Sequence, residues 1–282
     1  LTLQPVPNQR LAAQRRIKKE IFQVKRSQKE HSQRIQKEKF VRKEFPLILP
    51  RNEAQKQLQE GLKFNSLVVA AGSSGVGKTL MATYHAARKL HFGDIKKIIL
   101  IRAYQPLAGR TTGFLPGTLE EKLIPYYAQM LAYLEDALGK GSVEVALKSK
   151  TIEICSLETI RGRSWDDAIV LVDEAQGLFP MEVQALCTRI GENCQLIFMG
   201  DNSGVQTDVK RGMNGLDYLE KVVRTYNIED CCFVQFTKEH VERGSLTKSF
   251  VFAFEDEYLL DIQGEGIIKE YDKFKTSGRK KQ

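Results

Sequence analysis

The sequence predicts an α/β fold in which helices flank a parallel sheet, preceded by a basic helical arm. Two observations support this fold class. After residue 46, short apolar runs rich in β-branched residues alternate with longer helix-forming stretches. Before residue 46, the chain lacks that alternation and carries the excess positive charge. Repeated strand–helix–strand units imply right-handed crossovers, and these make neighbouring strands parallel.

Residues 1–45 form the predicted basic arm. They hold 13 Lys and Arg against 4 Asp and Glu, whereas the rest of the chain holds 30 against 31. Residues 9–44 contain neither Gly nor Pro, which favours a helix, and Pro46 ends it. The apolar positions of this helix are too few to bury a full face. We therefore expect the arm to pack on the body, to pair with a partner helix or to lie on an anionic surface.

Composition argues against a membrane or disulfide-rich protein. No apolar run reaches the roughly 18 to 20 residues that a membrane helix needs, and no apolar segment follows the basic N-terminus as in a secretory signal. We expect no membrane contact and a cytoplasmic location. The five cysteines form no C-x-x-C pair, which predicts reduced thiols rather than a zinc site or disulfides; they are Cys155, Cys187, Cys194, Cys231 and Cys232.

The body is predicted to span residues 46–260, followed by a basic tail over 261–282. Five apolar runs read as strands buried on both faces: Leu67–Ala71, Ile98–Ile101, Ile152–Cys155, Ile169–Val172 and Leu196–Met199. Three stretches between them are typical of helices: Lys78–Leu90, Leu119–Leu138 and Met181–Thr188. The tail has the composition of a frayed terminus.

The first predicted strand leads directly into a complete phosphate-binding motif, G-x-x-x-x-G-K-[ST]. Its residues are Gly72, Ser73, Ser74, Gly75, Val76, Gly77, Lys78 and Thr79. A strand before the motif and a helix after it are the context that the motif requires, which disfavours a chance glycine-rich turn. Backbone amides and the helix N-terminus attract phosphate oxygens. We expect Lys78 to contact the β- and γ-phosphates of ATP and Thr79 to ligate Mg²⁺.

Two acidic residues, Asp173 and Glu174, follow the strand Ile169–Val172. The carboxyl ends of parallel strands meet where such sheets bind ligands, so both residues are expected beside the phosphate loop. We expect Asp173 to hold the hydrated Mg²⁺ and Glu174 to orient or deprotonate the attacking water. An acidic N-cap for the next helix is the structural alternative.

A third strand end carries Asp201, which follows Leu196–Met199 and Gly200. A polar group at this position can sense the γ-phosphate and pass its presence to the following loop, which contains Gln206. The alternative is an ordinary Gly-Asp turn.

With these motifs in order, the chain resembles the PhoH-like ATPases, related to superfamily-one helicases, and in particular the versions found in bacteriophages. The resemblance runs from about residue 51 to residue 257. Besides the segments above, it rests on Gly113–Gly117, Glu120–Leu123, Ile160–Arg163, Asp173–Gln176 and Thr188–Gly191. The chain departs from the family at Gly177, where Asn is usual, and at Ala103, where Pro is usual.

The resemblance implies a RecA-like P-loop NTPase domain with ATP hydrolysis, self-association into a ring and a role in RNA handling. It places Gln55 where relatives contact adenine. It also places Arg243 where an arginine finger would reach a neighbouring subunit, the alternative being an exposed surface arginine. From the motif Thr188–Gly191, Arg189 is expected to join Asp201 in sensing the γ-phosphate.

Basic residues around the loop after Ile98–Ile101 are candidates for contact with RNA or single-stranded nucleic acid. They are Arg102, Arg110, Arg161 and Arg163, with Tyr104, Phe114, Tyr126 or Tyr127 available to stack bases. Alternatively, the aromatic residues are core and the arginines form a solvated rim. The leading function is an ATP-driven enzyme acting on RNA or single-stranded DNA. The alternatives are a nucleotide-dependent binding switch without unwinding and a small-molecule kinase.

Overall fold

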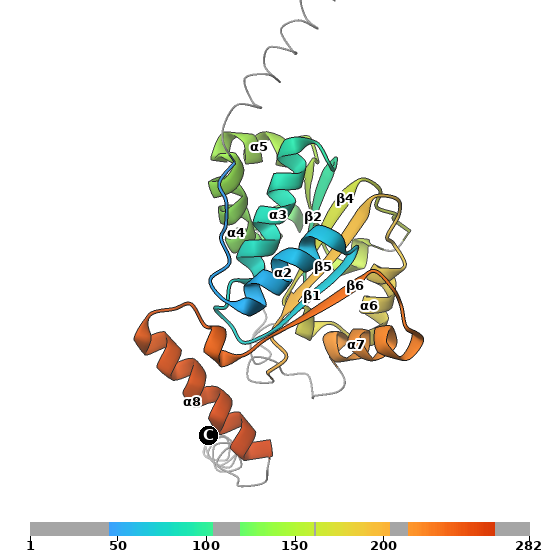
Figure 1. Cartoon of the computed structure of the whole chain (residues 1–282). Helices are drawn as coiled ribbons and strands as arrows, with labels where there is room; N and C mark the ends of the chain where they lie inside the picture. The colour runs from blue at the N-terminus through green and yellow to red at the C-terminus, as the bar shows by residue number, and fades with distance from the viewer. Residues whose placement is uncertain (1–44, 104–118, 161, 204–213, 263–282) are drawn as a thin grey trace, which may run out of the picture. The chain divides into compact units, whose positions relative to one another are not determined.

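The computed structural model describes residues 45–103, 119–160, 162–203 and 214–262 (Figure 1). The chain divides into two units, Leu1–Phe45 and Pro46–Gln282, and the described residues belong almost entirely to the second. The predicted arm up to residue 44 and the tail from residue 263 lie outside the described residues.

The centre of the second unit is a six-stranded sheet in the order β3-β2-β4-β5-β1-β6, and every pairing in it is parallel. Its strands are β1 (Leu67–Gly72), β2 (Lys97–Arg102), β3 (Ile152–Cys155), β4 (Ala168–Asp173), β5 (Cys194–Gly200) and β6 (Cys231–Phe236). The five predicted strands are confirmed. The prediction missed β6, an edge strand that is buried less completely than the central strands and whose apolar run ends at the exposed Gln235.

Helices cover both faces of the sheet, as the alternation of elements predicts (Figure 1). They are α2 (Glu53–Phe64), α3 (Lys78–Phe92), α4 (Leu119–Leu138), α5 (Lys140–Lys148), α6 (Pro180–Cys187), α7 (Gly215–Tyr226) and α8 (Ser245–Ile262). The three predicted helices are confirmed to within two residues, whereas α2, α5, α7 and α8 were not predicted. The helix α8 runs past the predicted boundary at residue 260. In the described part of the chain, no helix combines the length and the apolar character needed to cross a bilayer.

The core lies on the two faces of the sheet because alternate strand residues point in opposite directions. On one face, Val69, Val170 and Phe198 pack in a single cluster with Leu186 of α6 and Leu219 of α7. On the other face the sheet packs against α2 and α3, with α4 packed on α3. The central strands β1, β4 and β5 are therefore held rigidly on both sides.

The register of the sheet brings the carboxyl ends of its strands to one edge. Arg102 at the end of β2 is the register partner of Asp173 at the end of β4. Gly72 at the end of β1 is the partner of Phe236, and Ala71 is the partner of Gly200. Side chains that are far apart in the sequence thus meet at the carboxyl edge, where parallel sheets bind ligands.

Candidate nucleotide-phosphate site

The loop between β1 and α3 has a backbone that only glycine adopts without strain. Gly72 has a φ of 123°, and a Cβ there would lie 1.8 Å from the backbone oxygen of Phe236 in the neighbouring strand. Gly77, the N-cap of α3, has a φ of 92° and no side chain that caps the helix. The amide groups of the first helical turn are consequently left for a ligand, which is how helix N-termini bind phosphate.

Lys78 lies folded back over this loop in a buried position. Its Nζ donates hydrogen bonds to the backbone oxygens of Gly72 at 2.6 Å and Ser73 at 2.7 Å. Burial lowers the pKa of Lys78, while the nearby carboxylates of Asp201 and Glu174 act in the opposite direction. The loop thus holds the Lys78 ammonium group next to the phosphate-binding amides, where the negative charge of a bound phosphate would stabilise the protonated lysine.

Thr79 and Asp173 meet beside the loop as the motif spacing predicts. The Thr79 Oγ1 donates to the Asp173 Oδ1 at 3.2 Å. Asp173 is buried, and this burial raises its pKa, as does the neighbouring charge of Glu174. A hydroxyl and a carboxylate oxygen are ligands suited to Mg²⁺, which keeps several of its own waters and requires few protein donors. The donor set therefore fits the expected metal.

Glu174 is held from both sides by side chains that the prediction did not assign to it. Its Oε1 accepts a hydrogen bond from the Arg102 Nη2 at 3.0 Å, and its Oε2 accepts one from the Gln176 Nε2 at 2.7 Å. The Gln176 Oε1 in turn accepts from the backbone N–H of Asp201 at 3.0 Å. One hydrogen-bonded chain therefore joins the carboxyl ends of β2, β4 and β5.

The backbone of Glu174 is also unusual. Its φ of 52° and ψ of 37° lie in the left-handed region, which a non-glycine residue seldom occupies. Backbone strain of this kind concentrates at functional sites, where the surrounding structure imposes it. The short helix η3 (Ala175–Gly177) that follows places Gln176 between Glu174 and Asp201.

Asp201 lies at the end of β5 and lines the same cavity as Lys78 and Glu174. It is buried, and its Oδ1 accepts a hydrogen bond from the backbone N–H of Ser203 at 2.9 Å. Its role in sensing the γ-phosphate stays a prediction. Gln206, the other half of that hypothesis, lies outside the described residues.

Gln55 of α2 lies against the phosphate loop. Its Nε2 donates to the backbone oxygen of Val76 at 2.9 Å, and its Oε1 accepts from the backbone N–H of Arg51 at 2.8 Å. A glutamine amide has two donor hydrogens and two acceptor lone pairs, so one of each remains for a base. Gln55 lines the cavity, where the adenine hypothesis places it.

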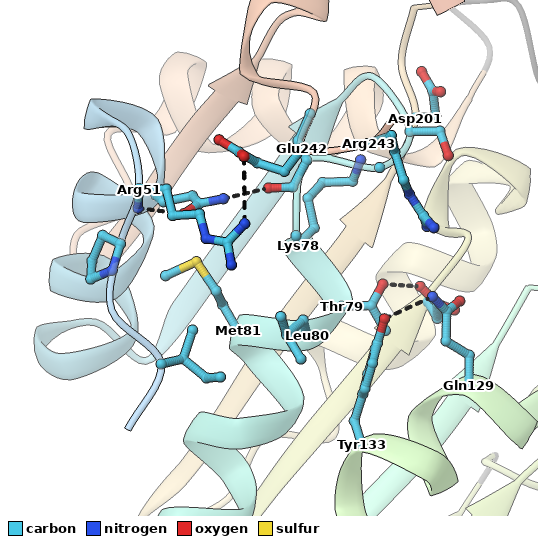
Figure 2. Close-up of a pocket in the computed structure, with 18 of the residues that line it drawn as sticks. Arg51, Lys78, Thr79, Leu80, Met81, Gln129, Tyr133, Asp201, Glu242 and Arg243 are labelled. Carbon is cyan, nitrogen blue, oxygen red and sulfur yellow. Dashed lines mark hydrogen bonds and ion pairs between the residues drawn. The ribbon is translucent and has the colours of Figure 1, made fainter. Parts of the chain in front are cut away.

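Arg243 lies against the phosphate loop of its own chain. A Cβ on Gly75 would approach the Arg243 Cγ at 2.9 Å, and the backbone N–H of Glu242 donates to the Gly75 oxygen at 3.1 Å. Figure 2 shows Glu242 and Arg243 beside Lys78, with Gln129 and Tyr133 of α4 beside Thr79. No hydrogen bond or ion pair within the described residues holds the Arg243 guanidinium. Arg243 thus lines the cavity of its own chain, and its role as an arginine finger toward a neighbouring subunit stays a prediction.

One cavity of about 750 Å³ is lined by most of the residues predicted to act on the nucleotide, namely Gln55, Lys78, Thr79, Asp173, Glu174, Asp201 and Arg243. Pockets that bind small molecules and cofactors span roughly 300 to 1,000 Å³. The segment before α2 forms one wall through Leu47–Arg51, and Gln129 and Tyr133 of α4 form another. Sequence reasoning did not single out either group of lining residues, because neither carries a motif.

The prediction for Arg189 is wrong. Arg189 follows α6, and its backbone oxygen accepts from the N–H of Trp165, three residues before β4 begins. This contact lies at the amino edge of the sheet, about one strand length, roughly 20 Å, from the carboxyl edge. The motif Thr188–Gly191 connects α6 to the start of β5, so it cannot sense a phosphate bound beside Lys78.

The two candidate nucleic-acid arginines within the described residues, Arg102 and Arg163, are each engaged in an ion pair. Arg163 pairs with Glu153 of the edge strand β3, and Arg102 pairs with Glu174. Arg110 and Arg161 lie outside the described residues, as do Tyr104 and Phe114. Tyr127 is buried, and its hydroxyl donates to the Cys155 oxygen at 3.1 Å, so it belongs to the core rather than to a base-stacking surface.

Comparisons with known proteins identify relatives of this chain. The model of the family described as PhoH-like protein matches residues 47–255. The chain is 35% identical over 202 residues to a PhoH-like protein of Bacillus subtilis (strain 168), an alignment covering 71% of this chain and 62% of the relative. It is 34% identical over 211 residues to Protein PhoH of Escherichia coli (strain K12), covering 73% and 58%. The chain thus spans less than two thirds of the length of either curated relative.

Among solved structures, the chain is similar in part to the large terminase of a thermophilic bacteriophage in complex with ADP. The TM-score is 0.38 at 12% identity, and the match covers 69% of this chain and 48% of the terminase chain. A Pif1 helicase from Candida albicans matches with a TM-score of 0.34 at 16% identity, over 68% of this chain and 41% of the helicase.

Proposed function

This chain belongs to the PhoH-like protein family, and from that premise we propose that it binds ATP with Mg²⁺ and hydrolyses it. One observation carries the proposal. The glycine loop with Lys78, the Thr79–Asp173 pair and the carboxylate of Glu174 all border one cavity, although they come from separate parts of the chain. Phosphoryl transfer depends mainly on such positioning and on charge stabilisation.

The proposed reaction transfers the γ-phosphoryl group to water. The water oxygen forms a bond to the γ-phosphorus, and the bond from that phosphorus to the bridging oxygen breaks, which leaves ADP and phosphate. Glu174 accepts the proton that the water loses. Lys78 and Arg243 bring positive charge to the oxygens on which negative charge increases. When bound, Mg²⁺ would be held by the Thr79 hydroxyl and by Asp173 and would neutralise charge on the β- and γ-phosphates.

We propose RNA or single-stranded DNA as the second substrate. The support is the uneven charge of the chain, since residues 1–45 carry 13 basic against 4 acidic residues and the rest is nearly neutral. If this arm neutralises about five phosphates, the logarithm of the binding constant falls with the logarithm of salt with a slope of about −4. Removal of residues 1–45 should flatten that slope and leave nucleotide binding intact. An unchanged slope in the shortened protein would exclude the arm as the contact.

An ATPase assay with and without single-stranded RNA tests the proposed function. The wild type should hydrolyse ATP only with Mg²⁺ present, and RNA should raise the rate; Lys78→Ala should hydrolyse at background level under both conditions. ATP hydrolysis that does not respond to RNA or single-stranded DNA would contradict the polynucleotide substrate. A strand-displacement assay then separates an unwinding enzyme from a nucleotide-dependent binding switch.

A further inference from the structure

The side chain of Arg102 connects the end of β2 to the residue that is proposed to deprotonate water. Its Nη2 donates to the Glu174 Oε1 at 3.0 Å, and its Nη1 donates to the backbone oxygen of Tyr126 in α4. The backbone N–H of Arg102 donates to the Tyr127 hydroxyl at 3.1 Å. The arginine is thus fixed at its backbone, while its guanidinium holds the carboxylate of Glu174.

Both carboxylate oxygens of Glu174 accept hydrogen bonds from side chains of the protein itself. Arg102 holds one carboxylate oxygen and Gln176 holds the other. These two hydrogen bonds fix the orientation of the Glu174 carboxylate, so it is less free to turn toward an attacking water than an unpaired carboxylate. The ion pair therefore opposes the step assigned to Glu174.

The position of Arg102 shows which partner is able to compete for it. Glu174 lines the nucleotide cavity, whereas Arg102 is not among the residues that line it. The ion pair remains open to solvent, with side-chain exposures of 26% for Arg102 and 39% for Glu174. A guanidinium binds phosphate oxygens with the same two-pronged geometry that it offers a carboxylate.

We propose that the Arg102–Glu174 ion pair restrains ATP hydrolysis, and that a backbone phosphate of a bound polynucleotide releases Glu174 by taking Arg102. This inference rests on the proposed function and adds a regulation to it. Arg102 is then a positioning residue: it acts on the reaction through Glu174 and touches neither the nucleotide nor the attacking water. The same guanidinium serves as both the restraint and the sensor.

The test compares Arg102→Gln with Lys96→Gln as a matched control. Lys96 pairs with Asp167 at the opposite edge of the same two strands, so its substitution also removes an ion pair between the β2 and β4 segments. ATPase rates are measured for the full chain without additive, with a uridylate 20-mer and with orthophosphate at the same phosphate concentration. Breaking a partly exposed ion pair should raise the rate of Arg102→Gln without additive about threefold to fivefold.

The RNA oligomer should raise the rate of the wild type and of Lys96→Gln, whereas Arg102→Gln should no longer respond. The KM for ATP should stay unchanged in Arg102→Gln, because Arg102 does not line the nucleotide cavity. Orthophosphate should leave all rates unchanged, since neighbouring contacts do not hold a single phosphate in place. Equal stimulation by orthophosphate would overturn a polynucleotide as the source of the phosphate.

A basal rate of Arg102→Gln at or below that of the wild type, or stimulation by RNA equal to that of the wild type, would overturn the proposal. If Arg102→Gln does not fold, Arg102→Lys replaces it, because lysine keeps the charge but lacks the planar fork that bonds Glu174 and the Tyr126 oxygen together. That variant should show a raised basal rate and a smaller response to RNA. A wild type that hydrolyses ATP without any response to RNA would instead contradict the proposed substrate, so the two failures are distinguishable.

Discussion

Both edges of the sheet contain non-glycine residues in the left-handed backbone conformation, but the residue types differ between the edges. At the amino edge, Asp167, Asn193 and Asp230 occupy left-handed positions directly before β4, β5 and β6, with φ of 50°, 49° and 59°. Lys150 occupies a fourth such position before β3, with a φ of 57°. Asp and Asn tolerate this conformation because their short side chains bond locally. At the carboxyl edge the corresponding residue is Glu174, with a φ of 52° and a longer side chain that is held by distant partners.

The charges at the two edges differ in the same way. The amino edge carries an exposed pair, Lys96 with Asp167, of the kind that contributes about 1 kcal/mol or less to stability. At the carboxyl edge, Lys78 and Asp173 are buried. Burial lowers the pKa of Lys78 and raises that of Asp173, so it favours the neutral form of both groups. We conclude that the residues of the amino edge suit the fold, whereas those of the carboxyl edge suit a ligand at some cost to the fold.

The largest expected effect that distinguishes the edges is on turnover. Glu174→Gln keeps the size of the side chain but removes the proton acceptor, so the ATPase rate should fall by about 10² to 10⁴-fold. Nucleotide affinity should change little because the phosphate loop is untouched. Single-turnover kinetics combined with equilibrium nucleotide binding checks both statements. Hydrolysis at the parent rate would remove Glu174 from the mechanism.

The next effect concerns stability at the amino edge under acid conditions. His85 of α3 contacts the Gln195 Oε1 near the start of β5 at 2.9 Å, and burial lowers its pKa to about 4. The unfolded chain takes up this proton near pH 6.5, before the folded chain does, so stability is lost as the pH falls from about 6.5 to 4. The loss should reach roughly 1 to 3 kcal/mol.

Urea unfolding at several pH values measures this loss, with His85→Gln as the control. The variant lacks the titrating group, so its stability should fall less steeply over the same pH range. Equal slopes for the two proteins would show that His85 titrates alike in the folded and unfolded states.

A smaller effect tests the backbone comparison directly. Asn193→Glu places at the amino edge the residue type that occupies the left-handed position at the carboxyl edge. It should lower the free energy of unfolding by about 1 to 2 kcal/mol through strain and the loss of the bond from the Asn193 Nδ2 to the Asp167 Oδ1 at 2.9 Å. The ATPase rate at a temperature where the protein stays folded should not change. A large loss of turnover with unchanged stability would contradict the division between the edges.

Contiguous features of the site could be predicted from the sequence, and features that join distant segments could not. The phosphate loop is one continuous segment, and the strands before the loop and before Asp173 are continuous apolar runs. The loop, Asp173 and Glu174 could therefore be placed at the carboxyl edge, where parallel sheets bind ligands. Arg102, Glu174, Gln176 and Asp201 belong to three strand ends, and their hydrogen bonds depend on the strand order.

One residue, Arg189, was placed wrongly, and one contact, that of Arg243 with Gly75, was not predicted. Arg189 carries a motif, but only the path of the chain from α6 into β5 shows that it lies at the wrong edge of the sheet. Arg243 follows β6, an edge strand without a clear apolar pattern, so its contact with Gly75 could not be predicted before β6 was placed beside β1. Strand order is a long-range property, and local patterns do not determine it.

The stabilisation of the folded protein by ATP with Mg²⁺ tests the central claim most directly. At about 100 times the dissociation constant, the ligand should raise the free energy of unfolding of the wild type by roughly 2.7 kcal/mol. Lys78→Ala should lose most of this gain, because its ammonium group is the cation that the loop holds at its mouth. A folded wild type that gains no stability from any nucleoside triphosphate with Mg²⁺, or a variant that gains as much as the wild type, would contradict the account.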